Sequence, residues 1–220
     1  MDNSNAWNNV PLEDYERHMK HETVAQSQLL NSLTGKYLQK YTPANALFLG
    51  ISGGNGLEHI DPINTKTVYG IDVNQSYLDE AKKRYDEKIS NLVLVNADIS
   101  NSNDSFVKAE FIWAALIFEY MDIESGLKFI AQNSSENGKL IVTIQSNNGN
   151  QSVSQTGVES IKSIKDLFKI VDSQRLHSFA SEIGFKLIGS EENVLPNGKC
   201  LLTYEFIRGK HSTSTSIYDT

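Results

Sequence analysis

The sequence has 220 residues, enough for one domain with a sizeable core, and carries 20 basic against 27 acidic residues, a formal net charge of −7. This balance argues against a protein that binds duplex nucleic acid or an anionic membrane, since both ligands require a basic surface. A single cysteine, Cys200, rules out an internal disulfide and a thiolate metal site. The longest apolar run, Phe111–Phe118, is too short to span a bilayer, and the polar N-terminus does not resemble a secretory signal, so we expect a cytoplasmic protein.

The N-terminal segment predicts helices that cover the rest of the chain. Apolar residues recur at helical spacing from Leu12 to Tyr41, and Pro43 ends the pattern because a proline cannot continue a helix. We therefore divide the chain into a helical cover at 1–41, which belongs to the same domain as the rest, and a main domain at 42–209. Residues 210–220 are mostly polar and predict a disordered tail.

Continuous apolar runs follow the cover, as expected for strands of a parallel sheet that is buried on both faces. Helical patterns lie between some of these runs, and the strand–helix–strand order predicts a doubly wound, Rossmann-like α/β sheet with helices on both faces. We place the strands at residues 46–49, 68–71, 92–95, 111–118 and 140–144, and the helices at residues 75–88, 123–132 and 173–183.

The C-terminal third predicts a change of direction in the sheet. Apolar segments at 185–194 and 200–207 flank Pro196-Asn197-Gly198, which is typical of a hairpin turn, so the mostly parallel sheet should finish with an antiparallel hairpin. The segment 146–159 is rich in Asn, Gln, Ser and Gly. We interpret it as an exposed loop, long enough to act as a lid or a substrate loop.

A glycine-rich segment, residues 50–56 with the sequence GISGGNG, follows the first predicted strand. Glycine allows a ligand to approach the backbone closely, and we expect a helix after this turn whose free N–H groups would face the ligand. Such a site suits a nucleotide or the carboxylate of an amino-acid-like ligand. A tight turn that binds no ligand is an equally good interpretation of the glycines alone.

Acidic residues follow the next two predicted strands. Asp72 comes after Gly56 at close to the spacing of about 20 residues at which an acid in such a sheet binds ribose hydroxyls. Asp98 follows the third strand in the same way. Either acid alone could merely cap a helix, but with the glycine loop they place polar groups at one sheet edge, where open α/β sheets bind ligands.

With these motifs the sequence resembles the class I S-adenosylmethionine-dependent methyltransferases over roughly residues 40–208, including the terminal hairpin. In that family the first loop reads acid-x-Gly-x-Gly-x-Gly. The corresponding positions here are Gly50, Ser52, Gly54 and Gly56, so the acid and the first glycine are both replaced. The resemblance implies S-adenosylmethionine as the cofactor and methyl transfer as the reaction.

The same resemblance implies roles for residues around the cofactor, in addition to the four loop positions. Asp72 would hold the ribose hydroxyls, Asp98 would accept a hydrogen bond from the adenine amino group, and Ile99 would lie against the base. The segment Asn137–Leu140 resembles the turn that leads into the fifth strand of that family.

Other nucleotide sites fit the glycine loop less well. A dinucleotide fingerprint G-x-G-x-x-G starting at Gly54 would need glycine where His59 stands, and a Walker loop would need lysine where Leu57 follows Gly56. An NAD-dependent oxidoreductase stays open as an alternative, because Asp72 would serve NAD equally well. The altered loop positions also leave open a module that binds S-adenosylmethionine or S-adenosylhomocysteine without catalysis.

Candidate substrate contacts come from two main places in the sequence. Glu119 and Tyr120 directly follow the fourth strand, where the family meets its substrate, and Glu119 would be costly to bury without a purpose. Tyr15, His18 and Met19 share one helix face; Tyr15 and Met19 also fit an ordinary core position, and His18 is expected to be partly exposed. The candidates are Glu119, His18 and Tyr15 as catalytic residues, and Tyr120, Met19 and Gln145, at the end of the fifth strand, as substrate contacts.

The predicted function is transfer of a methyl group from S-adenosylmethionine to an unidentified small molecule. The acidic charge disfavours a nucleic-acid substrate, and the helical cover could enclose a small pocket. The histidines do not form a spaced set with carboxylates that would indicate a metal site, so we expect no metal. The sequence leaves open whether the chain forms a homodimer and which atom accepts the methyl group.

Overall fold

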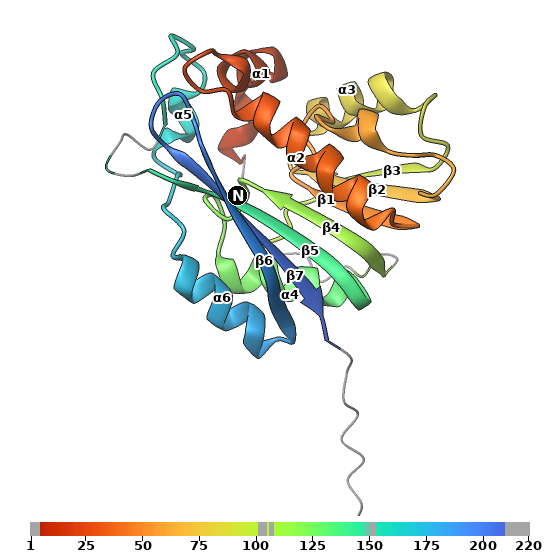
Figure 1. Ribbon diagram of the computed structural model, residues 1–220. Helices are drawn as coiled ribbons and strands as arrows, with labels where there is room; N and C mark the ends of the chain where they lie inside the picture. The colour runs from red at the N-terminus through yellow and green to blue at the C-terminus, as the bar shows by residue number, and fades with distance from the viewer. Residues whose placement is uncertain (1–4, 101–104, 106–107, 148, 150–152, 210–220) are drawn as a thin grey trace, which may run out of the picture.

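One mixed sheet forms the centre of the protein. A computed structural model describes residues 5–100, 105, 108–147, 149 and 153–209. Its strands are β1 (Asn45–Leu49), β2 (Thr67–Asp72), β3 (Leu92–Asn96), β4 (Ala109–Ala115), β5 (Ser134–Ser146), β6 (Phe185–Val194) and β7 (Cys200–Arg208). In this part of the chain they form a seven-stranded sheet in the order β3-β2-β1-β4-β5-β7-β6 (Figure 1). β1 to β5 pair in parallel, while β7 is antiparallel to β5 and β6. The predicted fold class is confirmed; the predicted tail at 210–220 lies outside the described residues.

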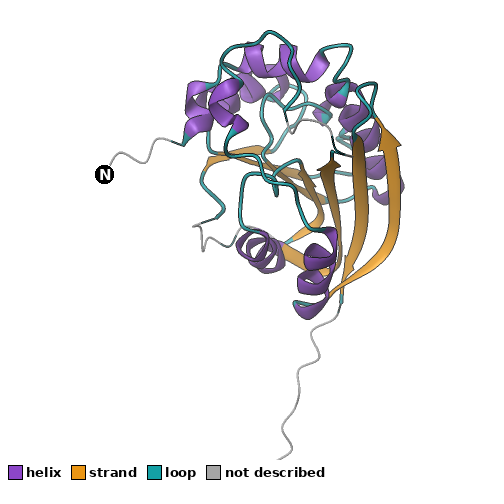
Figure 2. Cartoon of the chain, turned by 90° about the vertical axis from the view of Figure 1, so that its left-hand side faces the viewer, coloured by secondary structure: helices purple, strands orange, loops and turns teal. Residues whose placement is uncertain are grey.

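Helices flank this sheet on both sides, as Figure 2 shows. They are α1 (Leu12–Lys20), α2 (Gln26–Tyr41), α3 (Gln75–Tyr85), α4 (Ile123–Asn133), α5 (Lys162–Lys165) and α6 (Ser173–Glu182), with short 3-10 helices η1 (Ala6–Asn9) and η2 (Leu57–His59). α4 and α6 contribute to the apolar core on one face of the sheet, and α2 and α3 to the core on the other. No helix among the described residues is long and apolar enough to cross a membrane.

The central strands are apolar without interruption because each side of the sheet has its own core. In β1, Leu47 and Leu49 pack with residues of α4 and α6, whereas Phe48 packs with residues of α2. Successive side chains of a strand point to opposite faces, so a strand covered on both faces needs apolar residues at every position. All three of these side chains are buried.

The helical pattern predicted from Leu12 to Tyr41 forms two α-helices. α1 ends at Lys20, and α2 begins after Ala25, whose left-handed backbone (φ 49°) turns the chain between them. α2 then ends at Tyr41, and its C-cap residue Thr42, also left-handed, directly precedes Pro43. The predicted end of the helical region before Pro43 is thus confirmed. The break between the two helices, at residues 21–25, contains no proline or glycine from which it could have been predicted.

The connection from β1 to β2 differs from the expectation. No α-helix follows the glycine loop; the described chain makes turns and the three-residue η2 before β2 begins. α2, from the N-terminal cover, packs against this connection instead. A Cβ atom built on Gly35 of α2 would lie 3.0 Å from the His59 ring, and one built on Gly56 would lie 2.7 Å from the Thr34 side chain. Through this close packing α2 supports the glycine loop, in the place where a helix that follows the loop would usually lie.

Two further predictions about the sheet need correction. β4 stops at Ala115 because Leu116 adopts a left-handed backbone (φ 55°), so 116–118 turn away from the sheet instead of extending it. β5 begins earlier than predicted and shifts its register against β4 between Ala109 and Phe111. The segment 146–159 is not uniformly exposed, because Asn147 and Val158 are buried.

Candidate functional site

A pocket opens at the carboxyl ends of β1, β2 and β3, and we call it the strand-end pocket. Polar residues predicted from the sequence share its wall with side chains from the N-terminal segment and from the chain after β4. Its lining includes five residues predicted as cofactor contacts, Gly50, Ser52, Asp72, Asp98 and Ile99, together with Asn5, Trp7, Tyr15, Ile71, Val73, Tyr77, Ala97, Ser100, Ile117, Tyr120 and Met121.

Asp72 joins the glycine loop to the start of α3. One carboxylate oxygen, Oδ2, accepts a hydrogen bond from the backbone N–H of Ser52 at 2.9 Å, and Oδ1 accepts one from the N–H of Asn74 at 2.9 Å. Burial raises the pKa of Asp72, while these backbone hydrogen bonds act in the opposite direction. Asp98 is more exposed, and its Oδ1 accepts from the N–H of Ser100 at 2.9 Å.

The charge of the strand-end pocket is negative. Asp72 and Asp98 both line it, and its described lining contains no lysine, arginine or histidine. With η2 in place of a full helix after the glycine loop, the pocket also has no helix N-terminus there to bind an anion. This wall suits a neutral or cationic ligand with hydroxyl groups better than a phosphorylated one.

The glycines of the loop divide into two groups. Gly50 lines the strand-end pocket with φ +65°, and a Cβ atom there would approach Ile117 to 2.8 Å. Gly54 and Gly56, which the resemblance placed beside the cofactor, do not belong to this wall. A Cβ atom on Gly54 would lie 2.7 Å from the Tyr85 ring, so these two glycines allow α2 and α3 to pack closely on the loop.

The N-terminal segment closes the strand-end pocket through contacts to α3. Asn5 caps η1 by accepting a hydrogen bond from the N–H of Trp7 at 3.1 Å. The carbonyl of Trp7 in turn accepts from Asn74 Nδ2 at 2.9 Å, and the carbonyl of Val10 accepts from the hydroxyl of Tyr77 at 2.9 Å. These bonds hold the indole of Trp7 over the pocket wall.

A second pocket, the aromatic pocket, adjoins the first. Trp7, Tyr15 and Tyr120 line both pockets. The Trp7 and Tyr120 rings meet edge to face with centroids 4.9 Å apart, and Tyr120 meets Phe168 in the same way at 5.8 Å. The aromatic pocket is lined by Trp7, Tyr15, His18, Met19, Gln26, Leu116, Tyr120, Gln145, Val153, Ser154, Ile161, Ile164, Phe168 and Lys199.

Five of the six predicted catalytic and substrate residues meet in the aromatic pocket, namely Tyr15, His18, Met19, Tyr120 and Gln145. His18 is buried rather than partly exposed, because α1 turns it toward the loop after β5, where its Nδ1 lies 2.7 Å from the Thr156 hydroxyl. Burial, with the nearby positive charge of Lys199, lowers the pKa of His18 to about 4. The imidazole is therefore neutral at pH 7. Burial also raises the pKa values of Tyr15 and Tyr120, which remain protonated phenols.

Glu119 lies outside both pockets. Its side chain is fully buried behind Gln145, and its Oε1 accepts a hydrogen bond from the backbone N–H of Gln145 at 2.6 Å. Its other oxygen, Oε2, is buried with no hydrogen-bond partner among the described residues. Burial raises the pKa of Glu119 to about 7. In this structure Glu119 links the segment after β4 to the end of β5.

A third hollow, the loop-side pocket, lies across the glycine loop from the strand-end pocket. Tyr15, Gly50 and Ser52 line both of these hollows, so Tyr15 borders all three pockets. The remaining described lining of the loop-side pocket consists of Glu16, Met19, Lys20, Ser27, Gln28, Leu30, Asn31, Ser32, Phe48, Ile51, Gly53, Asn55, Glu58, Arg84, Tyr85, Trp113 and Ala115.

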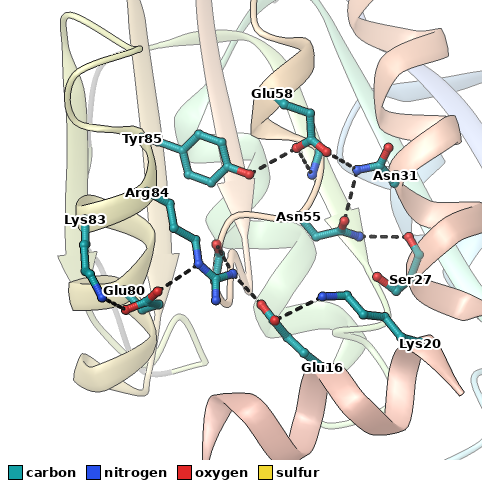
Figure 3. A network of polar contacts seen from close by, with 12 residues as sticks. Glu16, Lys20, Ser27, Asn31, Asn55, Glu58, Glu80, Lys83, Arg84 and Tyr85 are labelled. Atoms are coloured by element: carbon teal, nitrogen blue, oxygen red, sulfur yellow. Dashed lines mark hydrogen bonds and ion pairs between the residues drawn. The ribbon is translucent and has the colours of Figure 1, made fainter.

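Polar contacts around the loop-side pocket tie three helices to the glycine loop (Figure 3). Arg84 of α3 donates to Glu16 Oε1 of α1 at 2.5 Å and to the carbonyl of Gly53 at 3.2 Å. Asn31 of α2 donates from Nδ2 to Asn55 Oδ1 at 3.1 Å and to Glu58 Oε1 at 2.6 Å. The loop is therefore held from outside by side chains of the cover and of α3.

Several residues of these pockets were not identified from the sequence. Trp7 lies in an Asn-rich segment whose short 3-10 helix gives no periodic signal, and Phe168 and Lys199 come from segments far along the chain. Lys199 directly follows the predicted hairpin turn, and this position was the one feature of the sequence that could have indicated it. The described residues contain no group of three or more histidine, cysteine or acidic side chains that could hold a metal ion.

Comparison with solved structures identifies the fold. N-methyltransferase NodS from Bradyrhizobium japonicum WM9, in complex with S-adenosyl-L-homocysteine, matches 92% of this chain and 100% of its own at 13% identity and a TM-score of 0.66. Magnesium protoporphyrin IX methyltransferase (ChlM) from Synechocystis PCC 6803, with bound S-adenosylmethionine, matches 92% and 93% at 11% identity and a TM-score of 0.69. The [4+2]-cyclase SpnF matches 83% and 82% at 12% identity and a TM-score of 0.65.

Sequence comparison adds no closer relative. No protein-family model matches the chain, and the comparison with curated proteins gave no significant match. At 11–13% identity the structural likeness establishes architecture, and function has to be argued from the site. The chain has the fold of the class I S-adenosylmethionine-dependent methyltransferases.

Proposed function

We propose that the protein transfers the methyl group of S-adenosylmethionine to a small molecule bound in the aromatic pocket. The observation that carries this proposal is the position of Tyr15, which borders the strand-end, loop-side and aromatic pockets. A ligand whose nucleoside lies in the strand-end pocket and whose amino-acid tail lies in the loop-side pocket would carry its sulfonium at their junction. The methyl group would then point toward the aromatic pocket.

The strand-end pocket is the proposed adenosine site. Asp72 would accept hydrogen bonds from the ribose hydroxyls, Asp98 would accept one from the adenine amino group, and Ile99 would lie against the base; their common position in the lining of this pocket supports the proposal. The negative wall favours a nucleoside attached to a sulfonium over a nucleotide attached to a pyrophosphate. This charge argument, with the missing helix after the loop, disfavours the NAD-dependent alternative.

The methyl-transfer step forms a bond from the acceptor atom to the methyl carbon and breaks the bond from that carbon to sulfur, whose electron pair leaves with S-adenosylhomocysteine. Alignment of the three atoms supplies much of the rate in such a displacement. Tyr15 and Tyr120, which line the shared wall as protonated phenols, are placed to orient the acceptor by donating hydrogen bonds. We propose that Glu119 positions the backbone of Gln145 rather than removing a proton from the acceptor.

Separate calorimetric titrations with S-adenosylmethionine, S-adenosylhomocysteine and NAD test this proposal. We expect saturable binding of both sulfur compounds and none of NAD. Thermal unfolding gives an independent measure, because a ligand at about one hundred times its dissociation constant stabilises a folded protein by roughly 2.7 kcal/mol. The proposal would be overturned if NAD alone bound, or if neither sulfur compound bound to the folded protein.

A further inference from the structure

The glycine loop carries no charged side chain of its own. Its residues 50–56 read GISGGNG, and Gly50 stands at the position where the family has an acid. The amino-acid tail of S-adenosylmethionine carries one ammonium and one carboxylate. Charged partners for a tail that lies beside this loop must therefore come from other segments of the chain.

The loop-side pocket contains charged groups of both signs. Its volume of about 640 Å³ leaves ample room for the tail, and its described lining includes the acidic residues Glu16 and Glu58 and the basic residues Lys20 and Arg84. The described lining of the strand-end pocket, by contrast, has acidic side chains only. A wall with balanced charges suits a zwitterion, which brings one charge of each sign.

Ser52 lies where a ligand would pass from one pocket to the other. It lines both the strand-end and the loop-side pocket. Its backbone is left-handed (φ 52°), a conformation that is costly for a residue with a side chain. Its hydroxyl oxygen is buried and has no hydrogen-bond partner among the described residues. A ligand that spans the two pockets would offer this hydroxyl an acceptor.

The carboxylate of Glu16 lies directly against the glycine loop. A Cβ atom built on Gly53 would lie 2.8 Å from Glu16 Oε1. Partial burial raises the pKa of Glu16, but the hydrogen bonds from Arg84 and Lys20 outweigh it and hold the pKa below its ordinary value. The side chain is therefore ionised at pH 7. It also directly follows Tyr15, which borders all three pockets.

Arg84 is fixed in place on the other side of Glu16 (Figure 3). Its Nε donates to Glu80 Oε1 at 3.0 Å, and its Nη1 donates to Glu16 and to the carbonyl of Gly53. Nη2 donates to none of the described residues. A guanidinium held in this way keeps a donor for a carboxylate and loses little freedom when it binds one.

The other two charged residues of the lining fit the tail less well. Glu58 accepts from the backbone N–H of Gly56 at 3.0 Å and from Asn31 Nδ2 at 2.6 Å, so it fastens the end of the glycine loop. Lys20 is exposed, and its Nζ donates to Glu16 Oε2 at 3.2 Å.

We propose that Glu16 of α1 and Arg84 of α3 recognise the zwitterionic end of S-adenosylmethionine in the loop-side pocket, where Glu16 accepts from the ammonium and Arg84 donates to the carboxylate. This inference rests on the proposed function, of whose cofactor site it names the residues that recognise charge. The negative charge that the loop lacks at Gly50 is then supplied by a helix of the N-terminal cover.

Four ligands that differ in the tail test the proposal. S-adenosylhomocysteine carries both charges, its deaminated analogue carries only the carboxylate, its decarboxylated analogue only the ammonium, and 5′-methylthioadenosine neither. Calorimetric titration of the full chain should show S-adenosylhomocysteine binding about tenfold or more tightly than 5′-methylthioadenosine. Equal affinities for these two would overturn the inference and leave the proposed adenosine site intact, whereas no binding by any of the four would overturn both.

Charge-removing variants assign the two charges. Glu16→Gln should weaken binding of S-adenosylhomocysteine and of the decarboxylated analogue about fivefold or more, without weakening the deaminated analogue. Arg84→Met should weaken S-adenosylhomocysteine and the deaminated analogue by a similar factor, without weakening the decarboxylated one. Glu13→Gln and Lys82→Met remove the same charges from exposed positions of α1 and α3 and should bind all four ligands normally.

The same titrations separate recognition of the tail from support of the loop. A variant that weakens all four ligands equally, 5′-methylthioadenosine included, acts through the loop, and its assignment to the tail is then overturned. The assignment of Glu16 to the ammonium is also overturned if Glu16→Gln weakens the deaminated analogue as much as the decarboxylated one, because Glu16 would then act by positioning Arg84.

Discussion

The strand-end pocket and the aromatic pocket lie side by side but are built in different ways. The first uses residues directly after three parallel strands, which the sheet brings to one edge wherever the helices lie. The second collects side chains from the N-terminal cover, the end of β5, the segment 153–168 and the C-terminal hairpin. The strand-end residues of the first pocket are therefore specified by topology, whereas the second pocket depends on the packing of distant segments.

The largest effect on stability is expected where the glycine loop packs against α2. In Gly56→Ala a side chain must adopt φ +95° and lie 2.7 Å from Thr34, which is fully buried. We expect the free energy of unfolding to fall by about 2–5 kcal/mol, from backbone strain plus overpacking. Urea denaturation measures it. Gly157→Ala is the matched control, since Gly157 also has positive φ (+74°) but nothing within 4 Å of an added Cβ. Equal losses in both variants would contradict the packing role.

The buried support behind the aromatic pocket should respond to pH through Glu119. The folded-state pKa of about 7 lies above the ordinary value near 4.5, so the folded protein retains a proton that the unfolded chain releases. Stability should therefore fall as the pH rises from about 4.5 to 7, by on the order of 3 kcal/mol, and level off above 7.

Glu119→Gln removes this titration while keeping an oxygen that accepts from the Gln145 N–H. Urea denaturation at several pH values should show the variant gaining stability over the wild type as the pH rises. Glu192→Gln, at an exposed position of β6, serves as the control. A wild-type curve parallel to that of Glu119→Gln would show that Glu119 does not titrate in this range.

A smaller change should affect the strand-end pocket alone. Asp72→Asn keeps the size of the side chain and removes the charge, so the charge-assisted bonds that we propose from the ribose hydroxyls to Asp72 would be lost. We expect the affinity for S-adenosylhomocysteine to fall about tenfold or more in calorimetry. Asp79→Asn removes the same charge from an exposed position on α3 and should bind normally. Normal binding by Asp72→Asn would remove Asp72 from the site.

The smallest effect is expected where the cover is tied to the loop. Glu16 and Arg84 are partly exposed, so their ion pair should contribute about 0.2–1 kcal/mol. A double-mutant cycle with Glu16→Gln and Arg84→Met, read out as the free energy of unfolding in urea, isolates that coupling. A coupling of zero would mean that the contact does not transmit support from α1 to the loop.

Sequence patterns predicted the sheet and the strand-end pocket well because both follow from local signals. Asp72 and Asp98 were found from their place after apolar runs, and the hairpin from Pro196-Asn197-Gly198. The helix predicted after the glycine loop was wrong, because α2 occupies that side of the sheet from upstream in the chain. No local sequence pattern indicates that a helix from upstream in the chain takes the place of a helix after the glycine loop.

The aromatic pocket was predictable only in part. One face of α1 supplied Tyr15, His18 and Met19 correctly to a common wall, since helical spacing is local information. Lys199 and Phe168 join that wall only after the hairpin and the segment before α6 have packed. Glu119 was recognised as an unusual buried acid, but its direction, away from both pockets, depends on the backbone N–H of Gln145.

The support of the glycine loop by α2 and Arg84, in place of a helix that follows the loop, has a kinetic consequence. Because α2 and Arg84 hold the loop, any fluctuation that lifts the cover also loosens the strand-end pocket. Backbone amides in the middle turns of α2, where Asn31 and Thr34 contact the loop, and the release of a bound nucleoside should then share one opening event. Hydrogen exchange in α2 and the dissociation rate of S-adenosylhomocysteine would accordingly change together across variants of the cover.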